Sequence, residues 1–306
     1  MIDNLKFFVT DKIEWENRVM QTQCVHLNGR FHFHTGHALE YPKTGRYNNL
    51  NVCITDKRAY LVGSFHKFKN IWLYDKYHNY DDFTFDQYNE VKNMVCKSLY
   101  IQSKKTKLTN IEFGFNLSVN EDPQQIIDRI LMYDFNAPSR NLTFKGKGDY
   151  KEFITSDFSF KIYNKSKQNG LKDNILRIEM KMTRSRFFNK LGIYNLDDIK
   201  ATNLKNLFEV FLAYFDKLFI IDNLSLLKDL KKLNSDLVRD GLNPNYWLNI
   251  KRNDTRNIKA KQKAKFKKSV IDIYSFETKK YLRSLLQLKF DELLYCKNSL
   301  STREAI

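Results

Sequence analysis

Alternation of apolar and polar residues predicts strands over much of the first 185 residues. Short strands with loops are expected over residues 1–80, where 51–55 and 58–65 form a hairpin that turns at Asp56 and Lys57. Four further strands are predicted by the same alternation. They cover residues 109–119, 142–148, 152–163 and 174–183.

Helical spacing of apolar residues appears in three places. Residues 84–102 place Val91, Val95 and Leu99 on one helical face. A second helix is expected to begin at 120–123, where an acceptor side chain, acids and an early proline coincide, and to run to about Tyr133. From about Ser185 onward the pattern is almost wholly helical. One apolar face there consists of Leu204, Leu207, Val210, Phe211, Tyr214, Phe215 and Leu218.

This order of elements predicts an α+β fold, with an antiparallel sheet and flanking helices followed by an all-helical C-terminal region. We place a domain boundary near residue 200, giving residues 1–200 and a basic helical region over 201–306. The helical region could pack on the sheet or form a separate domain, and the sequence leaves both arrangements open.

Charge and cysteine content narrow the partners and the compartment. The 306 residues hold 52 Lys+Arg and 35 Asp+Glu, a net charge of +17, which favours nucleic acid or an anionic membrane surface. A lysine-rich chain can also reflect an AT-rich genome. Apolar runs are too short for a membrane span, and the N-terminus is unlike a signal peptide. The four cysteines lie far apart, which argues against structural zinc and disulfides and favours the cytoplasm.

Three predicted strands each carry polar residues on one face. These are Glu112, Gly114 and Asn116 in 111–117, Lys161, Tyr163 and Lys165 in 160–165, and Arg177, Glu179 and Lys181 in 176–182. If the strands share a sheet and turn their apolar sides to one core, the opposite face gathers two carboxylates, a tyrosine and several cations.

That mixture suits the cleavage of a phosphodiester by a tyrosine. A phenol with an ordinary pKa near 10 needs a base, cations or a metal to become a nucleophile. Carboxylates can hold Mg²⁺ or Mn²⁺, which polarises the phosphodiester, and cations can hold the DNA phosphates. The alternative is structural: Tyr163 packs, and Glu179 forms a solvated ion pair with Arg177 or Lys181.

The amino-acid sequences of these segments resemble the motifs of rolling-circle replication initiators. Residues 109–116 resemble their "R-I-D-x-x-x-(D/S)" strand, and 160–165 resemble their "(I/V)-x-x-Y-x-K" nucleophile strand. Residues 176–182, followed by 187–193, resemble "L-V-R-F-E-x-R-x" with its trailing "Y-L-K-x-x-G-L", and 62–68 resemble an upstream glycine-containing strand. The gene II-type initiators of filamentous phages are most similar, and Rep_trans-type proteins are more distant. The matching blocks cover about residues 50–195.

The resemblance implies a Rep nuclease-like fold and a nickase and strand transferase that opens rolling-circle replication of a phage or plasmid. Tyr163 would form a 5′-phosphotyrosyl link and free a 3′-hydroxyl. Glu112 and Glu179 would bind Mg²⁺ or Mn²⁺, and Lys165 would neutralise the phosphate or the phenolate.

Two positions depart from the family pattern. Asn110 stands where the family often has arginine, and Asn116 stands where plasmid relatives often have a carboxylate. Asn116 is therefore a candidate neutral metal ligand, with a lower expected metal affinity.

Several basic and histidine residues are candidate DNA or metal contacts. His32 and His34 form a His-x-His pattern that could bind a metal, lie free on the surface or contact DNA. Residues 251–268 hold nine Lys/Arg and one Asp, so we expect phosphate contacts there, although a solvated helix would look the same. The candidate DNA-binding residues are Arg177, Lys181, His66, Lys67, Lys259, Lys261, Lys263 and Lys265, and His66 is also a candidate metal contact.

Several rival functions share these features. A mobilisation relaxase or a single-strand transposase would use the same chemistry, and an origin-binding replisome organiser would need only the basic surface. An RNA-binding module is a further alternative, although no aromatic RNP-type motif is present.

The expected partners are single-stranded or supercoiled origin DNA, with host helicase and polymerase as candidates and no membrane. Tyr150 and Tyr194 could be second tyrosines, and their spacing favours neither.

Overall fold

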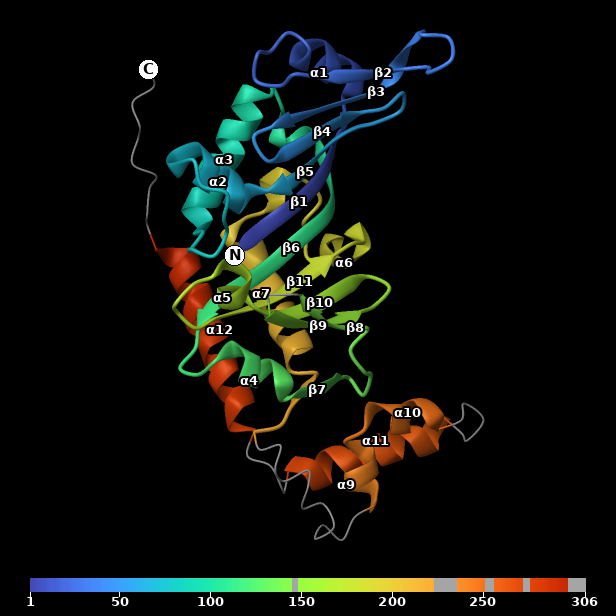
Figure 1. Ribbon diagram of the computed structural model, residues 1–306, viewed down its shortest axis with the longest axis vertical. Coiled ribbons are helices and arrows are strands. Elements are labelled where there is room, and N and C mark those ends of the chain that lie inside the picture. The colour runs from blue at the N-terminus through green and yellow to red at the C-terminus, as the bar shows by residue number, and fades with distance from the viewer. Residues whose placement is uncertain (145–147, 223–235, 251–255, 272–275, 297–306) are drawn as a thin grey trace.

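A ten-stranded antiparallel sheet organises the computed structural model, which describes residues 1–144, 148–222, 236–250, 256–271 and 276–296 (Figure 1). The strand order is β2-β3-β4-β5-β1-β6-β11-β10-β9-β8. The strands of this sheet are β1 (Ile2–Val9), β2 (Asn28–Phe31), β3 (Ala38–Tyr47), β4 (Leu50–Ile54), β5 (Ala59–Ser64), β6 (Thr106–Ser118), β8 (Arg140–Phe144), β9 (Gly148–Ile154), β10 (Phe158–Asn164) and β11 (Ile175–Met182). A separate pair joins β7 (Ile130–Tyr133) to β12 (Leu218–Ile220).

Helices follow or separate these strands. They are α1 (Lys12–Val19), α2 (Phe65–Tyr74), α3 (Phe85–Ser98), α4 (Pro123–Asp128), α5 (Lys165–Asn169), α6 (Ser185–Asn189), α7 (Ala201–Phe215), α9 (Asp236–Gly241), α10 (Pro244–Asn249), α11 (Arg256–Ile271) and α12 (Glu277–Tyr295). This combination confirms the predicted α+β class, an antiparallel sheet with flanking helices. No helix within the described ranges is long and apolar enough to cross a membrane.

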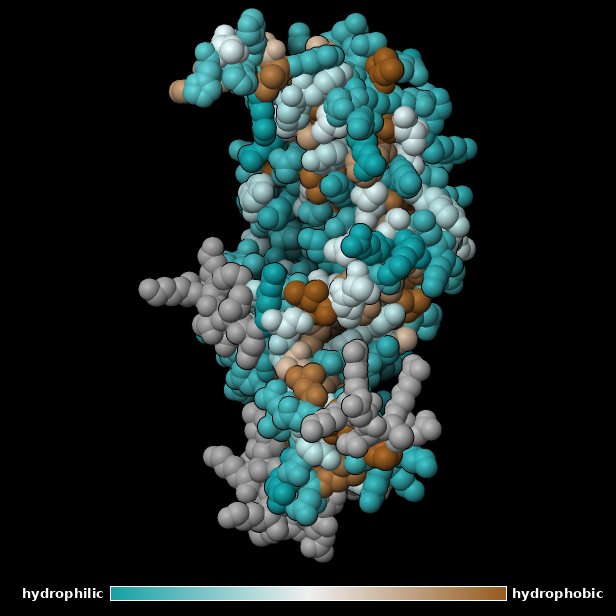
Figure 2. Space-filling model, turned by 90° about the vertical axis from the view of Figure 1, so that its right-hand side faces the viewer, coloured by the Kyte–Doolittle hydropathy of each residue, from teal (hydrophilic) through white to brown (hydrophobic). Residues whose placement is uncertain are grey.

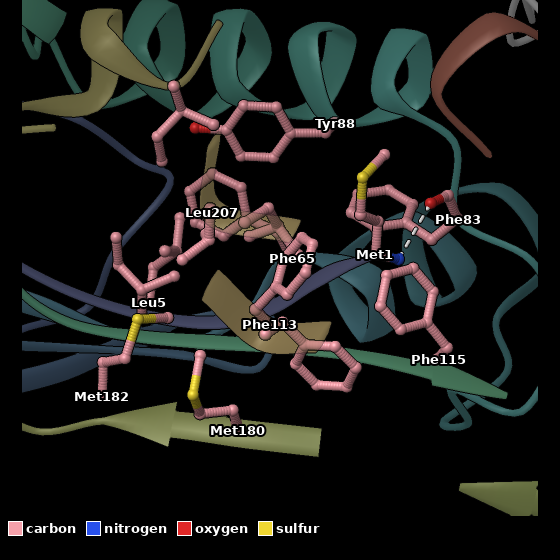
Figure 3. Packing of buried hydrophobic residues seen from close by; sticks show 14 of the residues in the cluster. Met1, Leu5, Phe65, Phe83, Tyr88, Phe113, Phe115, Met180, Met182 and Leu207 are labelled. Carbon is pink, nitrogen blue, oxygen red and sulfur yellow. Dashed lines mark hydrogen bonds between the residues drawn. The ribbon is translucent and has the colours of Figure 1, made fainter. Parts of the chain in front are cut away.

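The main core lies between one face of the sheet and α3, α7 and α12. On β6, Phe113 and Phe115 both meet Phe211 of α7 edge to face, with ring centroids 5.7 and 5.4 Å apart, and Phe115 also meets Phe290 of α12. Figure 3 shows Phe113 and Phe115 in this cluster together with Tyr88 of α3. The alternation of the strands therefore buries one face.

The opposite face of the sheet, here called the open face, carries partly exposed side chains. They include Lys6, Phe8, Tyr60, Glu112, Lys161 and Lys181. Hydrophilic residues also predominate over the upper half of the surface drawn in Figure 2.

The C-terminal helices divide between two clusters. Leu204 and Phe211 of α7 and Leu286 of α12 belong to the main core, so this core draws on residues from both sides of position 200. A second apolar cluster contains Trp247 and Phe266, from α10 and α11. The boundary at residue 200 stays a prediction.

The structure corrects several predicted element boundaries. The helix that begins at Pro123 ends at Asp128 rather than near Tyr133, because 130–133 pair with β12 about ninety residues later. Strand β12 also interrupts the helical pattern expected after residue 185. The strand predicted over 152–163 is two strands joined by a turn, in which the Thr155 Oγ1 accepts from the amide of Phe158. Residues 145–147 of the predicted strand 142–148 lie outside the described residues.

Two helices occur where only strands and loops were expected. α1 covers 12–19, and α2 begins at Phe65, directly after β5. Ser64 caps α2, because its side-chain oxygen accepts from the Lys67 amide at 3.0 Å. The predicted second strand of the hairpin therefore ends at Ser64, while the hairpin of β4 and β5 itself is confirmed.

Candidate active site on the open face of the sheet

The three strands with polar faces are neighbours in the sheet, in the order β6-β11-β10. Tyr163 pairs with Arg177, and Arg177 pairs with Asn116 on its other side. Lys181 of β11 pairs with Glu112 of β6 in the same way. The prediction that the three strands share one sheet and one polar face is confirmed.

A cavity of about 630 Å³ opens on this face. The strands β6, β10 and β11 and the start of α5 contribute Glu112, Lys161, Tyr163, Lys165, Glu179 and Lys181 to its lining. The lining also includes Lys67, Tyr77, His78 and Asn79, and Arg140, Tyr150 and Glu152. The structure thus brings together both predicted catalytic residues and both predicted acidic metal ligands.

Tyr163 is held by an acid and flanked by cations. Its hydroxyl donates to Glu179 Oε2 at 3.3 Å, and the ammonium groups of Lys161 and Lys165 lie 4.9 and 5.6 Å from its ring centroid. Burial, reinforced by the negative charge of Glu179, raises the Tyr163 pKa well above its ordinary value. The phenol therefore keeps its proton at neutral pH, and a nucleophilic role requires a base that removes it.

Arg177 lies beneath the cavity and orients its neighbours. Only 2% of Arg177 is exposed, and its Nε donates to Glu179 Oε2 at 2.6 Å. Its two terminal nitrogens donate to Asn116 Oδ1 at 3.1 Å and to Asp3 Oδ2 at 2.8 Å. This burial argues against direct DNA contact by Arg177 and favours a role in positioning Glu179.

Asp3 and Asn79 complete a buried network that the sequence reasoning missed. Asp3 accepts hydrogen bonds from Ser64 Oγ and from Asn79 Nδ2, and Asn79 Oδ1 accepts from Lys165 Nζ at 2.7 Å. One chain of contacts thus links the Arg177 side of Tyr163 to its Lys165 side. Burial, together with the charge of Arg177, lowers the pKa of Lys165 to about 8.

Glu112 is the most strongly perturbed acid of the cavity. Burial and then the charges of Glu179 and Asp3 raise the pKa of Glu112 to about 8. Glu112 and Glu179 occupy diagonal positions on β6 and β11, since Gly114 pairs with Glu179. A cation bound between Glu112 and Glu179 would offset the nearby negative charge and favour ionisation of Glu112.

The available ligands suit a cation that is bound jointly by the protein and by substrate phosphates, rather than by protein side chains alone. No group of three or more His, Cys, Asp or Glu within the described residues is placed to hold a metal. Asn116, the third predicted ligand, is engaged elsewhere: its Oδ1 accepts from Arg177, and its Nδ2 donates to the carbonyl of Asn79 at 3.1 Å. Mg²⁺ is commonly bound by one or two carboxylates plus substrate phosphates and water, and Glu112 with Glu179 fits that pattern.

Gly114 permits the close approach of β6 and β11 at this point. A Cβ atom at position 114 would lie 2.5 Å from the Cβ of Glu179 and 2.7 Å from the carbonyl oxygen of Ile178. The glycine on the predicted polar face is thus explained by its neighbouring strand.

The histidine candidates lie in different environments. His66 is 3% exposed; its Nε2 lies 2.8 Å from Asp81 Oδ1, and its ring stacks on Phe83. That burial argues against DNA contact by His66, whereas Lys67 lines the cavity. His32 and His34 lie on the exposed β2–β3 arm, with ring centroids 5.9 Å apart, and belong to no metal-ligating group of three within the described ranges.

The predicted basic run forms helix α11 from Arg256 onward, and residues 251–255 lie outside the described residues. Lys261 and Lys265 are exposed. Lys259 donates to the carbonyl of Trp247, and the Lys263 ammonium lies 4.4 Å from the ring centroid of Phe135. The structure therefore leaves Lys261 and Lys265 as the more accessible pair for phosphate contact.

The two additional tyrosines also differ. Tyr150 pairs with Tyr163 across β9 and β10, and the Lys161 ammonium lies 4.8 Å from the Tyr150 ring centroid. Tyr194 is 55% exposed and does not line the cavity. Of these two tyrosines, only Tyr150 lines the cavity, as Tyr77 also does.

Comparisons with known proteins identify no family. No family model matches the chain, and no curated protein matches it. Among solved structures, the chain is similar to a rolling circle replication initiator protein from Geobacillus stearothermophilus. The identity is 12%, the match covers 65% of this chain and 79% of that chain, and the TM-score is 0.36. We therefore base the functional proposal on the site itself.

Proposed function

We propose that this chain is a metal-dependent nickase and strand transferase that initiates rolling-circle replication of a phage or plasmid. The observation that carries the proposal is the placement of Tyr163. Its hydroxyl donates a hydrogen bond to Glu179 in a cavity of the open face. Lys161 and Lys165 flank its ring, and Lys181 lines the same cavity. A hydroxyl that lines a cavity, a base and several ammonium groups are suited to attack on a phosphodiester.

The proposed reaction is a transesterification that conserves the number of phosphoester bonds. Tyr163 Oη attacks the phosphorus, a new tyrosyl–phosphorus bond forms, and the bond between phosphorus and the 3′-oxygen breaks. The phenolic proton passes to Glu179, and the departing 3′-oxygen takes up a proton, returned from Glu179 directly or through water, and becomes a 3′-hydroxyl. Lys165 is 3% exposed and held against Asn79, but unlike Arg177 and His66 it lines the cavity, where it would neutralise the phosphate charge. The reverse reaction rejoins the strand.

We propose Mg²⁺ or Mn²⁺ as the cofactor, held by Glu112 and Glu179 together with phosphate oxygens of the DNA. When bound, the ion would stabilise negative charge on the reacting phosphate. The expected partners are single-stranded or supercoiled origin DNA, followed by host helicase and polymerase acting at the freed 3′-hydroxyl.

The test is formation of a covalent protein–DNA adduct. Wild type, Tyr163→Phe and the matched variant Tyr150→Phe are mixed with single-stranded and supercoiled DNA of the native replicon, with Mg²⁺ or Mn²⁺ and with EDTA. We expect a metal-dependent adduct, linked to the 5′ end of the DNA, that is lost in Tyr163→Phe and retained in Tyr150→Phe.

The other outcomes are equally informative. Loss of the adduct only in Tyr150→Phe would keep the reaction and reassign the nucleophile. Absence of any adduct, with tight and salt-sensitive binding retained, would favour a non-catalytic origin-binding organiser in which Tyr163 packs against its neighbours.

A further inference from the structure

A second feature of the open face lies on β1 and β5, away from Tyr163. Phe8 and Tyr60 pair across these strands and meet edge to face, with ring centroids 5.6 Å apart. The Lys6 ammonium lies 4.3 Å from the Tyr60 centroid, and the Arg58 guanidinium carbon lies 5.6 Å from the Phe8 centroid. We call Lys6, Phe8, Arg58 and Tyr60 the β1–β5 platform.

The platform faces solvent, and its cations are free for a ligand. Phe7 and Leu61 alternate with the platform rings and are 1% exposed, so the alternation turns Phe8 and Tyr60 away from the core. Both rings are partly exposed. The ammonium of Lys6 makes no hydrogen bond or ion pair with any described residue and rests instead over the rings.

The platform adjoins the active-site cavity across the sheet. Lys6 pairs with Asn110 of β6, and Glu112 of the cavity is the next residue of β6 on the same face. Residues in this diagonal relation lie roughly 7–8 Å apart. The platform therefore begins one diagonal step along the sheet from Glu112 of the cavity.

A chain of hollows supplies a second connection. A hollow of about 660 Å³ is lined by Tyr60, Arg46 and Asn51. A neighbouring hollow of about 350 Å³ shares Arg46 and Asn51 with it and shares Tyr77 with the active-site cavity. A flexible polymer could thus follow one path from the platform to Tyr163.

We propose that single-stranded DNA beside the cleaved phosphodiester lies across the β1–β5 platform. Its bases would stack on Phe8 and Tyr60, while Lys6 leaves the rings to meet a phosphate, joined by Arg58 and Arg46. Stacking of bases on aromatic rings beside free cations is the usual mode of binding for a single strand, whereas a duplex hides the faces of its bases. The identity of the ligand as DNA rests on the proposed nicking function.

The platform is tested by binding measurements in the Tyr163→Phe background, so that no covalent adduct interferes. Fluorescence anisotropy with labelled single-stranded DNA of the native replicon compares Phe8→Leu and Tyr60→Leu with the parent. Each leucine keeps an apolar side chain and removes the ring. We expect Kd to rise roughly tenfold for each ring, since one stacked base contributes about that much. Duplex DNA of the same sequence is expected to show little change.

Tyr295→Leu is the matched control. Tyr295 is 59% exposed at the end of α12, on the covered side of the sheet, and the Lys205 ammonium lies 5.3 Å from its ring centroid. Its loss should leave Kd unchanged. Lys6→Gln should lower the slope of log Kd against log salt by about one, because one phosphate contact is lost.

A photocrosslink makes the outcome independent of folding defects in the variants. Single-stranded DNA carrying 5-iodouracil is expected to crosslink to a peptide that contains Phe8 or Tyr60. Crosslinks to these residues without any nicking would keep the platform and reject the proposed reaction. Nicking with unchanged Kd in both leucine variants, and with crosslinks only elsewhere, would overturn the platform. A preference for RNA over DNA would overturn the assigned ligand.

Discussion

Glu112→Gln is expected to stabilise the metal-free protein at neutral and alkaline pH while abolishing metal-dependent nicking. The Glu112 pKa is about 8 in the folded protein, whereas an unfolded glutamate ionises near 4.5. Between these values the folded state keeps a proton that the unfolded chain releases. The free energy of unfolding of the wild type therefore decreases as pH rises through this window.

Glutamine is neutral in both states, so it removes this loss. At pH 7 the pH lies about 2.5 units above the pKa of the unfolded glutamate. At about 1.4 kcal/mol per unit, the upper limit of the effect on the free energy of unfolding is about 3.5 kcal/mol. The cavity is open to water, which screens these charges, so we expect roughly half of this limit. Near pH 4 the carboxyl is neutral in both states, and the two proteins should be equally stable.

The measurement is urea denaturation at several pH values between 4 and 8.5 in the presence of EDTA. Glu152→Gln is the matched control, because Glu152 lines the same cavity but lies 3.5 Å from the exposed Arg140. Loss of that pair, in which only the arginine is exposed, should cost at most about 1 kcal/mol. If the wild-type and Glu112→Gln curves run parallel from pH 4.5 to 8, the electrostatic description of the carboxylate pair is wrong.

Two further substitutions examine the support of the site. Gly114→Ala places a Cβ against Glu179, so it should lower the free energy of unfolding by about 1–3 kcal/mol in urea denaturation and suppress adduct formation. Gly29→Ala is the control, because its Cβ meets open space, and it should be neutral. Equal effects of the two variants would refute the close approach of β6 and β11 at Gly114. Asp3→Asn removes a buried ion-pair partner of Arg177 and should cost about 3 kcal/mol at pH 7, unlike Asp56→Asn in an exposed turn. Although burial opposes ionisation, Arg177 and hydrogen bonds hold the Asp3 pKa at about 2, so this difference should shrink as pH falls from about 4 toward 2.

The sequence predicted those parts of the site that depend on a local period. Alternation alone placed Glu112, Tyr163 and Glu179 on polar faces, and the pairing of β6, β11 and β10 confirms this. The start of α4 was equally local, because Asp122 accepts from the amide two residues on and a proline follows it. Local signals of this kind remain valid in any tertiary context that buries the apolar face.

The remaining features depend on pairings between distant segments. The end of the α4 helix was misjudged because residues 130–133 have apolar character suited to either element, and β12 decides the outcome. Asn79 carried no signal at all, since it lies in a loop and acts through Asp3 and Lys165. One signal was available and unused: Ser64 is an N-cap residue at the point where the strand pattern stops.

The path of β1 explains why an N-terminal aspartate supports a site built from distant strands. β1 lies in the middle of the sheet, between β5 and β6, although it begins the chain. Ile2 pairs with Phe113 and Leu5 with Ile111, so β1 contains one residue more than β6 over this stretch. Such a bulge re-aims a side chain, and here it accompanies the turn of Asp3 toward Arg177. A second register shift against β6 lies between Lys6 and Phe7, but the alternation along β1 itself continues and places Lys6 and Phe8 on the open face. One strand thereby supports Tyr163 from below at one end and presents the platform at the other, which gives the proposed DNA path a rigid base.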